Sequence, residues 1–143
     1  MSSILVALDD SRRAPSVFVA ATSLARRMGA RVYIIRVLWI PPDIPPAAHV
    51  PPSGVEGIVE EAAREELRRL MAAAPDVAFG PPIVVEGDPW RQILRVSDEL
   101  EVDLIVMGNH RHHGLERVLG TVAAKVVNHA HRDVLVVHSN HEP

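Results

Sequence analysis

The chain has 143 residues, a formal net charge of −3 and no cysteine. That is about the length of one domain, and such a chain buries enough apolar surface to fold without a disulfide or metal staple. The absence of cysteine excludes disulfides, thiolate zinc sites and thiol catalysis, and the interleaved acids and bases argue against a nucleic-acid surface. We expect one domain over residues 1–143, with residues 139–143 as a tail.

Short apolar runs alternate with stretches of helical periodicity along the chain. The runs predict five buried strands at Ile4–Leu8, Val32–Leu38, Ile83–Val85, Leu104–Met107 and Val134–Val137. Apolar residues at helical spacing predict four helices between them, over about residues 17–28, 55–74, 90–100 and 118–130. Strands that alternate with helices are typical of the α/β class. We therefore expect a doubly wound five-stranded parallel sheet with helices on both faces.

Local signals add detail to the first two helices. Pro15 fits the first turn of the first helix, and Gly29 fits its end. On the second helix, acid–base pairs at Glu60–Arg64 and Glu65–Arg69 mark the wet side. The apolar stripe that we expect to be buried there consists of Val55, Ile58, Val59, Ala62, Leu70 and Met71.

The segment Pro41–Gly54 holds six prolines, which exclude a helix or a central strand. It leaves the carboxyl end of the second predicted strand, and doubly wound sheets bind ligands at that edge. The segment is either a stiff spacer or a lid over a site, and the sequence leaves both possibilities open.

The stretch Asp103–Val122 carries the strongest functional signal. An apolar strand ends at Gly108, and a polar, histidine-rich loop with Gly114 leads to Gly120 and Thr121, where a helical pattern begins. A glycine at a strand end lets the backbone approach a ligand, and a helix start presents amide N–H groups that hold phosphate. A plain helix start with Thr121 as its cap is the commoner explanation of the last pair alone, but the whole combination predicts a nucleotide site.

Asp9 follows the first predicted strand. If the first and fourth strands are neighbours, Asp9 faces Gly108 at the mouth of the crevice, where its carboxylate can bind a ribose or steady the loop amides. Asp9, with Asp10 and Ser11, can equally be a helix N-cap.

Several segments together resemble the universal stress protein family. They are VALDDS at 6–11, EGDP at 86–89, DLIVMG at 103–108, GLERVLGTVAAKVV at 114–127 and VLVVH at 134–138, in the family's order along the whole chain. The resemblance implies the strand order 3-2-1-4-5 and a homodimer joined through the last strand. It also implies an ATP site in members with the motif G-x2-G-x9-G-[ST], whose backbone holds the phosphates.

Carried over residue by residue, the resemblance assigns most of the candidate site. Gly108 matches the first glycine of the motif, Gly120 with Thr121 closes it, and Asp9 matches the aspartate after the first strand. Val37 matches the position whose backbone meets adenine. The neighbouring lining positions match Ala7, Met107 and Val122.

The motif departs from the family pattern at its second glycine. That position is Arg111, and only eight residues separate it from Gly120 where the motif has nine. The guanidinium either folds outward and contacts phosphate, or it fills the pocket in a member that does not bind ATP.

Other site chemistries find less support. His110, His112 and His113 crowd the loop, but adjacent loop histidines point apart and have no cysteine or carboxylate beside them, so we expect no metal site. The chain has no G-x-G-x-x-G after its first strand, no P-loop and no G-x-S-x-G elbow.

We therefore expect a small stress-response protein that binds ATP as a regulatory ligand. The alternatives are a family member that works through protein–protein contacts without a nucleotide, and a slow ATPase. An exposed last strand, residues 134–137, favours a homodimer because open sheet edges invite pairing. The chain shows neither a signal-peptide pattern nor an apolar run of the roughly 20 residues that a membrane helix needs, so we expect the cytoplasm.

Overall fold

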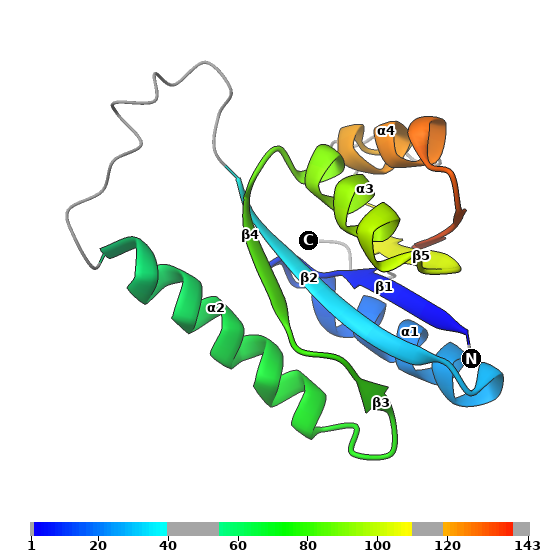
Figure 1. Ribbon diagram of the computed structural model, residues 1–143, viewed down its shortest axis with the longest axis horizontal. Coiled ribbons are helices and arrows are strands. Elements are labelled where there is room, and N and C mark those ends of the chain that lie inside the picture. Colours follow the sequence, from blue (N-terminus) through cyan, green and yellow to red (C-terminus); the bar gives the residue numbers. More distant parts are fainter. Residues whose placement is uncertain (1, 40–54, 110–118, 139–143) are drawn as a thin grey trace.

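The computed structural model describes residues 2–39, 55–109 and 119–138, with the side chains of residues 55 and 56 left out. Strands and helices alternate along this part of the chain, except where two strands follow one another after the second helix (Figure 1). In chain order they are β1 (Ser3–Ala7), α1 (Ala14–Met28), β2 (Arg31–Trp39), α2 (Val55–Ala72), β3 (Ala78–Phe79), β4 (Ile83–Gly87), α3 (Pro89–Leu100), β5 (Leu104–Gly108), α4 (Thr121–His129) and β6 (Asp133–Val137).

All strands belong to one parallel sheet. Its order is β3-β2-β1-β5-β6, and β4 also pairs with β2. The predicted order 3-2-1-4-5 is confirmed, because β4 is the third of the expected strands. The sixth strand, β3, was not predicted. Its two residues pair with the first two residues of β2, and two residues are too short to carry a periodicity.

Helices cover both faces of the sheet, as predicted (Figure 1). Alternate side chains of a strand point to opposite faces, so each central strand contributes to two cores. Ile4 and Val6 of β1 pack with α1 and α2, whereas Leu5 between them packs with α3 and α4. The sheet is therefore buried on both sides, which explains its continuous apolar strands.

The first helix begins and ends where the sequence predicted. Pro15 lies in the first turn of α1. Gly29 caps the carboxyl end with a φ of 64°, a left-handed conformation that glycine adopts without strain. Its N–H donates to the carbonyl of Ala25, so the chain turns at once into β2.

The predicted buried stripe of α2 is partly wrong. Ala63 and Leu67 are buried and Leu70 and Met71 pack against the same core, but Ile58, Val59 and Ala62 are exposed. At 3.6 residues per turn, Ile58 lies about 140° around the helix from Ala63. The helix buries the stripe that starts at Ala63, and the apolar residues before it face outward.

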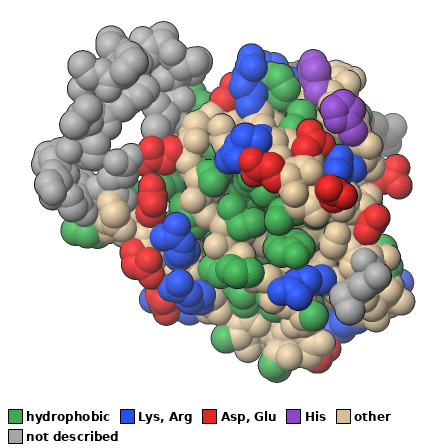
Figure 2. Space-filling view, in the orientation of Figure 1, with side chains coloured by type: hydrophobic (Ala, Val, Ile, Leu, Met, Phe, Trp, Pro, Cys, Tyr) green, Lys and Arg blue, Asp and Glu red, His purple; other side chains and the backbone are tan. Residues whose placement is uncertain are grey.

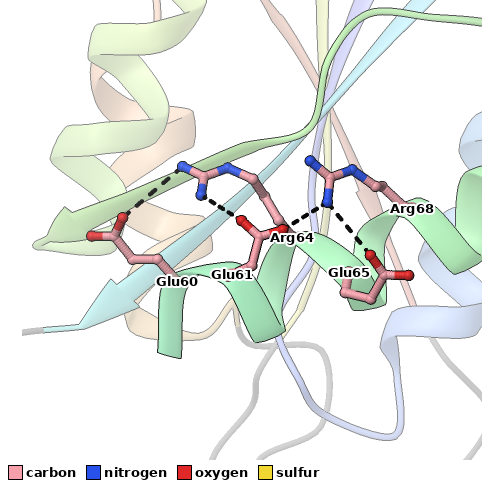
Figure 3. Close-up of polar contacts among 5 residues, drawn as sticks. All are labelled: Glu60, Glu61, Arg64, Glu65 and Arg68. Carbon is pink, nitrogen blue, oxygen red and sulfur yellow. Dashed lines mark hydrogen bonds and ion pairs between the residues drawn. The ribbon is translucent and has the colours of Figure 1, made fainter. Parts of the chain in front are cut away.

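The outer side of α2 carries a ladder of ion pairs (Figure 3). Arg64 lies 4.0 Å from Glu60, which confirms the first predicted pair. Glu65 instead lies 3.4 Å from Arg68, so the predicted pairing with Arg69 is wrong. Arg68 also donates to Glu61 at 2.8 Å, and this hydrogen bond lowers the pKa of the Glu61 carboxyl. Such exposed pairs add little stability.

Charged side chains of both signs are interspersed over the face drawn in Figure 2. No helix in the described part of the chain is long and apolar enough to span a membrane.

Candidate functional site

A cavity of about 140 Å³ opens at the carboxyl ends of the central strands. β1, β2 and β5 form its floor, and the first turns of α3 and α4 form its walls. Its lining residues are Ala7, Leu8, Asp9, Ile35, Val37, Pro89, Ile93, Met107, Gly108, Val122 and Ala123. This is the crevice that doubly wound sheets use for ligands.

Most of the predicted site residues meet at this cavity. They are Ala7, Asp9, Val37, Met107, Gly108 and Val122. Gly120 and Thr121 do not line it but immediately precede Val122 at the start of α4. Arg111, Gly114 and the histidines at 110, 112 and 113 lie outside the described residues, as does the proline-rich segment 41–54.

Five lining residues were missed by sequence reasoning: Leu8, Ile35, Pro89, Ile93 and Ala123. Ile35 lies two residues before the predicted Val37, so the alternation of β2 alone places it on the same face. Ile93 and Ala123 come from helices, and only the packing of those helices on the sheet brings them to the cavity.

Asp9 lies at the mouth of the cavity and is held on two sides. Its Oδ1 accepts a hydrogen bond from the N–H of Ser11 at 2.9 Å, and its carbonyl accepts one from Arg36 at 3.2 Å. The N-cap residue of α1 is Arg13, so the alternative that Asp9 caps this helix is wrong. Asp9 instead forms a turn with its own backbone two residues on, which fixes its carboxylate beside the strand ends.

The guanidinium of Arg36 contacts this turn through its hydrogen bond to the Asp9 carbonyl. The side chain of Arg36 is only 9% exposed and forms an ion pair with Glu66 of α2. Its Nε is buried without a hydrogen-bond partner among the described residues. A buried charge of this kind needs its partners, so Arg36 ties α2 to the end of β1.

The turn from β4 to α3 supplies one wall. Gly87 has a φ of 137°, a conformation that side chains rarely allow, and Asp88 then precedes the helix as its N-cap. Pro89 takes the first turn of α3, where its missing N–H costs nothing. The short motif at 86–89 therefore turns the chain sharply enough for Pro89 and Ile93 to reach the cavity.

Gly108 is glycine for a packing reason. A β-carbon at this position would lie 2.9 Å from Cγ2 of Val17 in α1, on the far side of the sheet from the cavity. Gly108 therefore allows α1 to approach β5 closely. The sequence prediction was that glycine lets a ligand approach the bare backbone. Gly108 does line the cavity, but a side chain at this position would meet α1 on the other face of the sheet.

Asn109 connects the end of β5 to the start of α4. Its Oδ1 accepts a hydrogen bond of 2.7 Å from the N–H of Gly120, and both residues are buried. Gly120 is the N-cap of α4, and Thr121 is an exposed first helical residue, so the alternative that Thr121 caps the helix is wrong. Sequence reasoning singled out Gly120 but not Asn109.

The arrangement suits a flat apolar group with a polar neighbour. An apolar protein cavity of about 150 Å³ accommodates a benzene ring, and this cavity is of that size, with Asp9 at its mouth. A ring system would enter between the strand floor and the helix walls, leaving attached polar groups at the mouth. Among the residues that the structure describes, no cluster of three or more His, Asp or Glu side chains could hold a metal ion.

Comparisons with known proteins agree with this architecture. The family model described as the Universal stress protein family matches residues 1–138. Universal stress protein MJ0531 of Methanocaldococcus jannaschii is 34% identical over 123 residues, which cover 82% of this chain and 70% of that protein. Universal stress protein A homolog 1 of Coxiella burnetii is 30% identical over 136 residues, 94% of each protein. A solved structure of a universal stress protein in complex with cAMP is 25% identical, with a TM-score of 0.69 and 96% of both chains covered.

Proposed function

Because the chain belongs to the universal stress protein family, we propose that it binds an adenine nucleotide, with ATP as its regulatory ligand. The adenine ring lies in the cavity at the carboxyl ends of β1, β2 and β5. The ribose and the phosphates extend past Asp9 toward the start of α4.

The observation that carries this proposal is the pairing of an apolar, ring-sized cavity with a fixed carboxylate. The lining side chains other than Asp9 are all apolar. They match the faces of a base, and burying those faces is the main source of affinity. Asp9 is positioned at the mouth by Ser11 and Arg36, where its carboxylate accepts hydrogen bonds from ribose hydroxyls.

The solved relative that binds cAMP supports an adenine nucleotide as the class of ligand. That ligand carries the same base and ribose as ATP but a single phosphate, so the shared part is what the cavity and Asp9 would contact. That the ligand of this chain carries three phosphates, as ATP does, is a further and separate part of the proposal.

We expect ATP to bind more weakly than in a member with the complete glycine motif. Arg111 replaces the second glycine, and the motif is one residue short before Gly120. A hydrogen bond contributes about 1 kcal/mol, and up to about 3 kcal/mol when one partner is charged. Two misplaced amides that each lose part of this value, about 0.7–2 kcal/mol, would then weaken binding by about tenfold to a thousandfold. If the Arg111 guanidinium contacts phosphate, that charge-assisted hydrogen bond recovers part of this loss.

The same departure supports a second candidate, a family member that acts through protein contacts without a nucleotide. Calorimetry with ATP on the wild type and on Arg111→Gly separates the possibilities. The glycine variant binds more tightly if the side chain fills the pocket, and more weakly if the guanidinium holds phosphate.

The cavity itself is tested by a charge placed in its lining. Val37 is half-buried there, so Val37→Asp puts a carboxylate against the base, in a variant whose fold is checked by far-UV circular dichroism. The matched control is Val19→Asp, because Val19 is 60% exposed on α1. We expect calorimetry to show loss of adenosine and ATP binding in the first variant and retention in the second. Unchanged binding by Val37→Asp would place the ligand elsewhere, and no binding of millimolar ATP or adenosine by the wild type would favour the second candidate.

A further inference from the structure

Asn109 connects the end of β5 to the start of α4 through a hydrogen bond of its side chain. It is the first residue after β5, and its side-chain oxygen accepts the N–H of Gly120, eleven positions later, at 2.7 Å. Asn109 is only 3% exposed, so water does not compete for this bond. In α4 the carbonyl of Gly120 accepts from Ala124 at 2.9 Å, so both polar groups of Gly120 are engaged.

This bond joins the floor of the cavity to one of its walls. Met107 and Gly108 of β5, in the floor, immediately precede Asn109, and Val122 and Ala123 of the α4 wall follow Gly120 by two and three positions. Moving α4 away from β5 would therefore widen the space between the floor and this wall. The bond resists that movement.

Apart from this bond, the described contacts of α4 are packing against the core and the contacts of Lys125 and His129 with the Trp90 ring of α3. Its buried side chains are Ala123 and Val126, both small, on a helix of nine residues. A short helix with few large buried side chains has little apolar area to hold its position. A directional hydrogen bond at its first turn supplies what packing does not.

We propose that Asn109 is a positioning residue for the nucleotide pocket, which holds the first turn of α4 against β5 so that the cavity is already formed when the base arrives. This inference rests on the proposed function. Without the bond, only a fraction of the molecules hold the α4 wall at the required distance from the floor, and the apparent affinity falls by that fraction. The loss appears in the association rate, because the contacts made after binding are unchanged.

The test uses adenosine, because it carries the base and ribose without phosphate charges that could respond to other changes at the helix start. Asn109→Ala removes the acceptor and leaves the Gly120 N–H buried without its partner. A buried unmade hydrogen bond shifts an equilibrium by roughly fivefold to a hundredfold, and we expect adenosine affinity to fall by about tenfold within that range. Stopped-flow binding should show slower association with an unchanged dissociation rate.

Two further variants separate positioning from a general loss of stability. Asn109→Asp keeps an oxygen at the same place, so it should restore adenosine affinity to within about twofold of wild type. Ala63→Gly in α2, on the opposite face of the sheet, destabilises a helix without touching the cavity, so its adenosine affinity should equal that of the wild type.

The possible outcomes are distinguishable. Wild-type affinity in Asn109→Ala, failure of Asn109→Asp to restore binding, or an equal loss in Ala63→Gly would each overturn the positioning role and leave the proposed function standing. Failure of the wild type to bind millimolar adenosine would overturn the proposed function and the positioning role together.

Discussion

Replacing Ala7 by leucine should fill the cavity that we assign to the adenine ring. Ala7 is the last residue of β1, lines the cavity and packs with the core on the α3–α4 side of the sheet. The change adds three carbon atoms at the floor of a space of about 140 Å³. A larger side chain there competes directly with the base for the same volume.

The effect on the unliganded protein should be small. Three buried carbons contribute about 2.4 kcal/mol at roughly 0.8 kcal/mol each if the cavity receives them. Overpacking costs roughly 1–3 kcal/mol, so the two effects largely cancel. The matched control is Ala21→Leu, because Ala21 is fully buried between α1 and the sheet and is not among the residues that line the site cavity. That variant should be destabilised by the full cost of overpacking.

The assay is thermal unfolding with and without adenosine. At a ligand concentration of 100 times Kd, binding stabilises the folded state by about 2.7 kcal/mol. Wild type and Ala21→Leu should both show the corresponding rise in Tm, whereas Ala7→Leu should show almost none. An undiminished ligand-induced rise in Ala7→Leu would refute the location of the ring, whatever the stability of the free protein.

Three further predictions concern assembly, packing and pH. Leu135 is 39% exposed on the edge strand β6, and we expect Leu135→Lys to shift a homodimer toward monomer in sedimentation; a monomeric wild type at tens of micromolar would contradict this. Gly80→Ala places a methyl group 2.4 Å from the Tyr33 ring and should lower the free energy of unfolding by about 1–3 kcal/mol. Gly57→Ala, in open space on α2, should raise it by about 0.5–1 kcal/mol. Urea unfolding of both variants measures the difference. A hydrogen bond from Arg26 lowers the pKa of Asp76 below 3.8. This pair therefore stabilises the fold above that pH and loses its effect as the pH falls through the lowered pKa. Asp76→Asn should remove this dependence from a profile of Tm against pH.

Most of the fold could be predicted from the sequence because its strands and helices follow simple periodicities. Continuous apolar runs such as Leu104–Met107 occur where a strand is buried on both faces, and Pro15 and Gly29 mark the two ends of α1 by their backbone preferences. These signals are local, so they can be read without knowing the tertiary contacts. The face of α2 was harder to predict, because apolar residues occur around much of its circumference and only the sheet decides which stripe is buried.

The candidate site was predictable where the backbone determines it. The strand ends place Ala7, Met107 and Val37 at one edge of the sheet, and the cavity forms there. The polar network was not predictable. Arg36 reaches Asp9 across 27 positions and Asn109 reaches Gly120 across eleven, and neither spacing has a local periodicity. Such partners depend on which elements become neighbours, so they emerge only with the fold.

Equilibrium dialysis with labelled ATP tests the central claim most directly, with any ligand that copurifies identified by mass spectrometry. The proposed function predicts saturable binding of one ATP per chain, competed by adenosine and abolished in Val37→Asp. Absence of saturable binding at millimolar ATP, in protein from which any copurified ligand has been removed, would contradict it.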